Sequence, residues 1–272
     1  SLHDALPILM ILANVAAAET LESADVPTMY RVHDRPSDEK RDRLNAFLKS
    51  LHYKGVREDA EPKDFNAILI KADGTKQDYA INEFVLRSQS QAEYSPNNIG
   101  HFGLALSHYA HFTSPIRRYA DVLVHRALIK ALHLGAGALT TEEADTFENM
   151  SEHISSTERQ SAAAEMDAVD RYIASFLAGR EGEVFTGRIS SVTAFGLFVA
   201  IDEYGADGFI PFRLMTGDYY EYDDTAQQLV GRGSGKVYRM GDILRVILVE
   251  CSPETGGLIF KPLRAKKYKW KA

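Results

Sequence analysis

The chain has 272 residues, of which 45% are hydrophobic and 25% are charged, an ordinary composition for one large or two medium globular domains. The formal net charge of −7 excludes a protein that holds nucleic acid by its overall charge, so any RNA contact requires local basic patches or base stacking. The single cysteine, Cys251, excludes an internal disulfide framework and a cysteine-based metal cluster. We therefore expect a protein of the reducing cytoplasm.

The most apolar run is Pro7 to Ala18, near the start of the sequence. It is far shorter than the roughly 20 residues that a membrane-spanning helix needs. No lysine or arginine precedes it, as one would in a signal peptide, and Asn14 interrupts it with a polar side chain. We therefore expect a buried helix and no membrane contact.

Helical periodicity follows over most of the first 180 residues. It predicts helices over residues 38–51, 64–71, 76–91 and 141–178, and an extended segment over 27–33. Thr140 or Thr141 can cap the last of these helices, where Glu142 and Glu143 complement the dipole of the first turn. A break near residues 179–182 predicts a domain boundary.

The stretch from Thr113 to Tyr119, TSPIRRY, combines a helix start with two adjacent arginines. Ser114 can cap a helix whose first residue is Pro115, because proline has its φ angle preset and no N–H to lose. The free amides of such a turn and the guanidinium of Arg117 together predict a site for an anion such as phosphate. Alternatively, Arg117 and Asp121, four residues apart, form only a surface ion pair worth a few tenths of a kcal/mol.

Spacing also divides the faces of this helix. The apolar residues Ile116, Ala120, Leu123, Ala127 and Ala131 predict a core face, and Arg117, Asp121 and His125 share another. The same region contains His101, His108, His111 and His125. The pair His108 and His111 allows a metal site, but the carboxylate or thiolate partners of a zinc site are missing. We expect these histidines to be core or phosphate-facing polar groups.

From Glu183 the hydrophobic pattern changes from helical to alternating. Short strands are predicted at residues 184–189, 195–201, 208–211, 243–250 and 257–260, a set that suits a small barrel. Phe195 and Phe198 are predicted on a face where bases could stack; the alternative is that either ring belongs to the barrel core. Residues 213–239 form a long insertion rich in Tyr and Asp.

The end of the chain is basic. Residues 261–272 contain Lys261, Arg264, Lys266, Lys267, Lys269 and Lys271 without an acid, interleaved with Tyr268 and Trp270. On an acidic protein this composition suits RNA phosphates or stacked bases, and a solvated tail is the alternative.

Residues 91–125 resemble the signature region of the RNB family, the exoribonucleases of the ribonuclease II and ribonuclease R type, with the ribonuclease R type the more similar. Residues 10–19 resemble a helix in the middle of the family's catalytic domain, and the pattern G-x-I-x-x-V-x-x-F-G-x-F-V from Gly187 resembles an S1-type RNA-binding domain, an OB-fold. The expected fold class is α+β and multi-domain. It comprises a mainly helical C-terminal half of an RNB catalytic domain (1–181, truncated at its start), an all-β S1-type barrel (183–262) and a basic tail (263–272).

The resemblance implies a processive 3′→5′ exoribonuclease that uses Mg²⁺ to hydrolyse single-stranded RNA to nucleoside 5′-monophosphates. Arg117 and Arg118 are the implied catalytic residues, and Arg117 is the one expected to neutralise charge on the phosphate. We expect RNA contacts from His111, Ser114, Tyr119, Glu165, Phe185, Phe195, Phe198, Lys267 and Trp270. Glu165 matches a helix that faces the catalytic channel in the family, although a surface acid is the alternative.

In the family, the metal-binding aspartates precede the helix that residues 10–19 resemble, and no Asp-rich run stands there in this sequence. We therefore expect a chain without metal ligands that is inactive alone. The rival hypothesis is a non-catalytic RNA-binding fragment or adaptor. A translation-associated S1-type protein is a weaker rival, because it leaves the motif at Ser114 to Arg118 unexplained. We expect a monomer with single-stranded RNA as its partner and no small-molecule cofactor.

Overall fold

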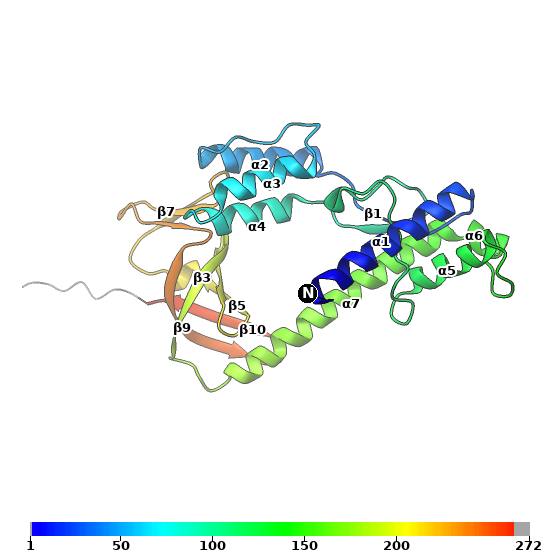
Figure 1. Cartoon of the computed structure of the whole chain (residues 1–272). Helices are drawn as coiled ribbons and strands as arrows, with labels where there is room; N and C mark the ends of the chain where they lie inside the picture. Colours follow the sequence, from blue (N-terminus) through cyan, green and yellow to red (C-terminus); the bar gives the residue numbers. More distant parts are fainter. Residues whose placement is uncertain (1, 264–272) are drawn as a thin grey trace, which may run out of the picture. The chain divides into compact units, whose positions relative to one another are not determined.

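The computed structural model of the protein describes residues 2–263 and divides into two compact units. The first, here called the helical unit, comprises Ser1–Arg41, Val56–Ala67 and Leu86–Ser161. The second, here called the barrel unit, comprises Asp42–Gly55, Ile68–Val85 and Ala162–Ala272. Figure 1 traces the chain through both units, and each is described separately below.

The helical unit contains the elements that carry the predicted motifs. These are α1 (Leu2–Ser23), the two-stranded antiparallel sheet of β1 (Tyr30–Val32) and β2 (Glu93–Ser95), α5 (Tyr119–Ala131), α6 (Thr141–Asp145) and the first half of α7 (Phe147–Leu177).

The helices α2 (Asp38–Ser50), α3 (Pro62–Ala72) and α4 (Asp78–Ser88) match the predicted helices over residues 38–91 to within a few residues at each end. Their existence was therefore predicted correctly.

The helix α1 is buried on one face and only toward its C-terminal end. Asn14, Ala17, Ala18 and Leu21 lie in the core, where α1 contacts α5. In contrast, Leu6, Ile8, Leu9 and Leu12 are exposed, so the expectation that the whole run of residues 7–18 is buried was wrong. Its segment Ala5–Ser23 passes a test of length and apolar composition for a membrane span, a test that core helices also pass.

The helix after the TSPIRRY motif begins four residues later than predicted. Pro115, Ile116 and Arg117 form a turn in which the N–H groups of Arg117 and Arg118 donate to the carbonyl of Ser114, and α5 starts at Tyr119 with Arg118 in an extended N-cap conformation. Ser114 is therefore not the cap. Ile116 is fully exposed rather than in the core, because it sits on this turn and not on the helix.

The predicted helix over residues 141–178 is two helices. Thr140, one of the two predicted caps, caps α6 in a capping box with Glu143, and Thr146 separates α6 from α7. The last turns of α7 bury Ala174 and Leu177 in the core of the barrel. The two compact units divide within α7, between Ser161 and Ala162.

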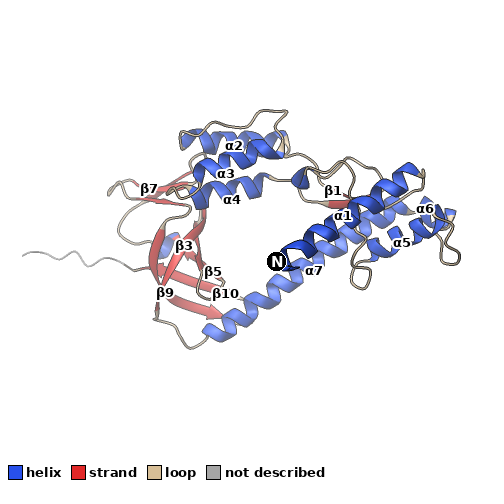
Figure 2. Ribbon diagram, in the orientation of Figure 1, coloured by secondary structure: helices blue, strands red, loops and turns tan. Residues whose placement is uncertain are grey.

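The barrel was predicted correctly. The strands β3 (Val184–Thr193), β4 (Gly196–Ile201), β5 (Ala206–Pro211), β9 (Ile243–Ser252) and β10 (Gly257–Pro262) close in the order β10-β5-β4-β3-β9. Alternate residues such as Ile189, Val199 and Ile210 point into the core. Figure 2 shows these strands gathered at the C-terminal end of α7.

The insertion of residues 213–239 adds a sheet that the sequence did not predict. The strands β6 (Tyr220–Asp223), β7 (Gln228–Gly231) and β8 (Val237–Arg239) pair antiparallel in that order. The carboxylate of Asp218 accepts from the backbone N–H groups of Gly233 and Ser234 and fixes the loop after β7. Each strand has only three or four residues, too few for a clear alternating pattern.

Candidate functional site

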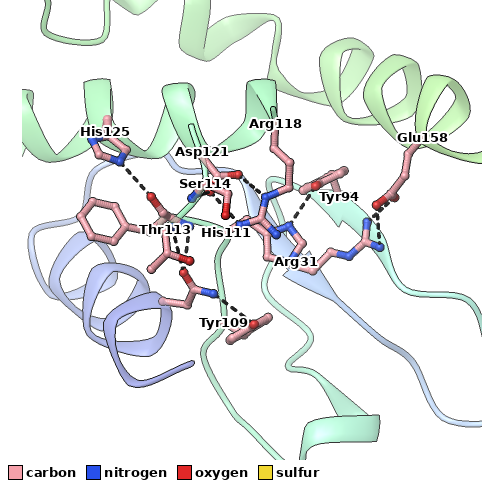
Figure 3. Close-up of polar contacts among 12 residues, drawn as sticks. Arg31, Tyr94, Tyr109, His111, Thr113, Ser114, Arg118, Asp121, His125 and Glu158 are labelled. Carbon is pink, nitrogen blue, oxygen red and sulfur yellow. Dashed lines mark hydrogen bonds and ion pairs between the residues drawn. The ribbon is translucent and has the colours of Figure 1, made fainter. Parts of the chain in front are cut away.

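The loop of residues 112–118, here called the Arg117 loop, is held at Ser114 by a buried carboxylate. Asp121 on α5 is fully buried, and its Oδ1 accepts from the backbone N–H of Ser114 at 2.7 Å. Its two oxygens also accept from Arg118, from Nε at 2.8 Å and from Nη2 at 2.9 Å. Figure 3 shows this fork between Arg118 and Asp121. Arg118 therefore neutralises the buried carboxylate and ties the loop to α5.

Arg117 is exposed, and none of the described residues forms an ion pair or hydrogen bond with its guanidinium. The proposed surface pair between Arg117 and Asp121 is therefore wrong, because Arg117 precedes the helix and Arg118 takes the carboxylate. His125 does not join them on a shared face either. Its Nε2–H donates to the carbonyl of Phe112 at 2.9 Å, and its ring stacks on the Phe112 ring with centroids 4.4 Å apart.

A second arginine lies beside this loop in a bidentate ion pair. Arg31 on β1 donates to Glu158 on α7 through Nη1 at 2.6 Å and Nη2 at 3.1 Å. Its guanidinium carbon lies 4.6 Å from the centroid of the Tyr94 ring. Figure 3 places Arg31, Tyr94 and Arg118 close together. This pair could not be predicted from the sequence, because its members are 127 residues apart.

The hydroxyl of Tyr94 connects this pair to His111. Burial raises the pKa of Tyr94, so the hydroxyl keeps its proton, and its oxygen shares a hydrogen bond with Nδ1 of His111 at 2.9 Å. Burial first, and then the charges of Arg118 and Arg31, lower the pKa of His111 to about 3. Burial likewise lowers the pKa of His101 to about 4, with a further contribution from His33. Both imidazoles are therefore neutral near pH 7, and His111 shares a hydrogen bond with Tyr94 inside the unit.

No described residues form a group of three or more His, Cys, Asp or Glu side chains that could hold a metal ion. The alternative of a site at His108 and His111 finds no support, since Nδ1 of His111 is bonded to Tyr94 and His108 lies 3.8 Å from Glu22 alone. The described residues therefore do not fit Mg²⁺, and we derive no metal-dependent step from them.

On the barrel, the structure separates the predicted stacking rings into two groups. Phe195 is 77% exposed and Phe198 is 41% exposed, so neither belongs to the core. Phe198 pairs with Phe209 on β5, with ring centroids 4.9 Å apart. Phe185 is buried against Phe260 and is not available to a base in this structure. The exposed-ring face is here defined as Phe195 and Phe198, with the half-buried Phe209 beside Phe198.

The remaining predicted residues are dispersed. Ser114 is partly buried in the Arg117 loop and Tyr119 is 53% exposed at the start of α5, so both lie beside Arg117 in the chain and in the helical unit. Glu165 is exposed on the part of α7 that belongs to the barrel unit, which neither supports nor excludes a site role. Lys267 and Trp270, with most of the basic tail, lie outside the described residues.

Two known domain families match this chain, one over its first half and one over the barrel strands. The RNB domain model matches residues 3–134, which include the Arg117 loop, and the S1 RNA binding domain model matches residues 180–261. The chain contains an RNB domain followed by an S1 RNA binding domain. The RNB match begins at residue 3, within α1.

Relatives in the RNB family are similar over nearly the whole chain. Ribonuclease R of Aquifex aeolicus is 41% identical over 260 residues, which are 95% of this chain and 37% of that protein. Mycoplasma genitalium RNase R, solved in complex with ribose methylated single-stranded RNA, superposes with a TM-score of 0.83 at 30% identity over 95% of this chain and 41% of the other. The chain thus spans about two fifths of the length of these relatives.

The fold also occurs in a protein described as a pseudonuclease. Yeast Ssd1 superposes with a TM-score of 0.65 at 20% identity, over 82% of this chain and 28% of Ssd1. An identity this low shows the shared fold alone. Hydrolysis must therefore be argued from the residues of the site and not from the fold.

Proposed function

We propose that this chain is part of a processive 3′→5′ exoribonuclease that hydrolyses single-stranded RNA to nucleoside 5′-monophosphates. The observation that carries the proposal is Arg117, an exposed arginine that forms no ion pair with the described residues, on a loop whose backbone is fixed by the buried carboxylate of Asp121. A guanidinium that makes no ion pair with the described residues is available to two oxygens of one phosphate. The single-stranded RNA in the Mycoplasma genitalium RNase R complex supports the choice of substrate.

Arg117 and Arg118 have different roles in this proposal. Arg118 already donates to both oxygens of Asp121, through Nε and Nη2 of its guanidinium. Arg117 can reorient without breaking any described contact, so it can follow the charge that develops on the phosphate as the bond breaks. Arg117 is therefore the proposed catalytic residue, and Arg118 supports the loop.

Dependence on Mg²⁺ is part of the proposal, with ligands from outside the described residues. The 272-residue chain should then bind single-stranded RNA without degrading it, because an arginine alone does not generate a nucleophile. A monomeric state and a cytoplasmic location are further proposals.

The test incubates the purified chain with a labelled single-stranded oligoribonucleotide and Mg²⁺. We expect binding that weakens steeply with salt, because phosphate contacts release counterions, and no release of nucleotides. Release of nucleotides at a rate proportional to the concentration of the chain would contradict the proposal that the metal ligands lie outside the described residues. Absence of RNA binding at low salt would contradict the proposal as a whole.

The second candidate function is a non-catalytic RNA-binding protein. It is favoured by the pseudonuclease fold of Ssd1 and by the lack of a metal-holding group among the described residues. The two candidates differ in the full-length protein that carries this chain. An exoribonuclease shortens RNA there in the presence of Mg²⁺, whereas an RNA-binding protein leaves it intact.

A further inference from the structure

The loop that carries Arg117 is held from a second side by one amide on α1. Asn14 is 4% exposed, and its Oδ1 accepts from the backbone N–H groups of Phe112 at 2.9 Å and Thr113 at 3.2 Å. Its Nδ2 donates to the hydroxyl of Tyr109 at 3.1 Å. The partners are 95 to 99 residues away in the chain. Figure 3 shows the hydrogen bonds of Tyr109 and Thr113.

Three consecutive backbone N–H groups of the loop are therefore held by side chains of two helices. Those of Phe112 and Thr113 donate to Asn14 on α1, and that of Ser114 donates to Asp121 on α5. Residues 111–114 lie outside every strand and helix, so no ladder supplies these N–H groups with acceptors. A hydrocarbon side chain at position 14 would leave two of them unpaired.

Arg117 follows only three residues after this fixed segment. Its position is set by the turn that starts at Ser114, while its own side chain has no described partner. A rotation of residues 112–114 would therefore move Arg117 with the turn. Asn14 controls that rotation without reaching the exposed side chain itself.

We propose that Asn14 is a positioning residue, which fixes the backbone of residues 112–113 so that Arg117 meets the phosphate in the reactive orientation. The inference rests on the proposed function of Arg117. Misplacement of a catalytic group by about 1 Å can cost on the order of 10²-fold in rate. We therefore expect loss of Asn14 to lower the rate of the chemical step by about 10- to 100-fold, with little change in RNA affinity.

The experiment compares three variants in the full-length protein that carries this chain, by single-turnover cleavage of a single-stranded oligoribonucleotide. Asn14→Leu keeps the volume but removes every hydrogen bond and should be slow. Asn14→Asp keeps an acceptor for both backbone N–H groups and should restore most of the rate. Tyr109→Phe is the matched control, because it removes only the bond to Nδ2, and it should cleave at the wild-type rate.

A double variant separates positioning from a general loss of structure. If Asn14 acts through Arg117, the variant with both Asn14→Leu and Arg117→Ala cleaves as slowly as Arg117→Ala alone. If the fold-reductions in rate of the two single variants multiply in the double variant, Asn14 acts independently of Arg117 and the inference is wrong. Equal rates for wild type and Asn14→Leu would also overturn it.

Two measurements keep the result decisive. Amide hydrogen exchange on the 272-residue chain should become faster at Phe112 and Thr113 in Asn14→Leu and stay unchanged in Tyr109→Phe. If Asn14→Leu fails to fold, Asn14→Ser replaces it, and a wild-type rate with fast exchange in that variant overturns the inference. A wild-type rate for Arg117→Ala would instead refute the proposed function, whereas a slow Arg117→Ala beside a normal Asn14→Leu refutes only the role of Asn14.

Discussion

The Arg117 loop and the exposed-ring face of the barrel present the side chains that we propose to be functional in opposite ways. The loop has irregular backbone, and its shape depends on buried polar side chains of two helices, Asn14 and Asp121. The rings of Phe198 and Phe209 face outward because alternate residues of a strand point to opposite sides of the sheet. A single buried residue far along the chain can thus disable the loop, whereas the ring face should respond only to substitutions of the rings themselves.

The largest expected effect is on the stability of the helical unit. Asp121→Ala leaves Arg118 without its partner and the N–H of Ser114 without an acceptor in a buried site. Breaking a buried pair in this way costs about 3–5 kcal/mol of unfolding free energy. Chemical denaturation of the 272-residue chain measures this loss.

The matched control is Asp167→Ala, which removes a surface carboxylate paired with Arg171 at 3.0 Å. An exposed pair of this kind is worth about 0.3–0.5 kcal/mol. Equal losses for the two variants would contradict the structural role given to Asp121.

The next effect concerns RNA affinity on the barrel. Phe195→Ala should weaken binding of single-stranded RNA by about 1–3 kcal/mol, because stacking on a base is lost without a change in the core. Fluorescence anisotropy titrations at fixed salt measure it. Phe185→Leu is the core control and should lower stability while the folded protein binds normally. A Phe195→Ala variant with unchanged affinity would remove this ring from the proposed interface.

A third prediction uses pH to separate the two regions. All nine histidines precede residue 154, so the barrel strands contain none. Because the folded pKa of His111 is about 3, against about 6.5 when unfolded, the unfolded state binds a proton first as pH falls. The stability of the helical unit is therefore complete above pH 6.5 and declines toward pH 3, by about 2 kcal/mol at pH 5 from His111 alone.

His111→Gln keeps an acceptor for Tyr94 but does not titrate, so its unfolding free energy should depend less on pH between 6.5 and 4 than that of the wild type. Far-UV circular dichroism measures this unfolding through the loss of helix signal. An equal pH dependence of unfolding for His111→Gln and wild type would contradict the assignment of His111 as a sensitive group.

The barrel strands and the Arg117 loop differ in how far their structure could be predicted from the sequence, and the reason is physical. The barrel strands follow from local alternation, and its five-strand closure was predicted with nearly correct boundaries. The Arg117 loop was assigned to a helix because Ile116 and Ala120 are spaced as on a helix, although Pro115 to Arg117 form a turn. Local spacing cannot reveal that Asp121 selects Arg118 or that Asn14 holds Phe112, because those bonds depend on tertiary packing. The one signal available was the polar Asn14 within an apolar run.

The central claim, that Arg117 is the catalytic arginine on a loop fixed by buried groups, is tested most directly in the full-length protein that carries this chain. The measurement is the single-turnover cleavage rate and the RNA affinity of Arg117→Ala beside wild type. We predict a rate lower by 10²-fold or more, about 3 kcal/mol in activation free energy, with affinity nearly unchanged and little rescue by Arg117→Lys. A wild-type rate for Arg117→Ala together with a slow but folded Arg118→Ala would contradict the account and transfer the catalytic role to Arg118.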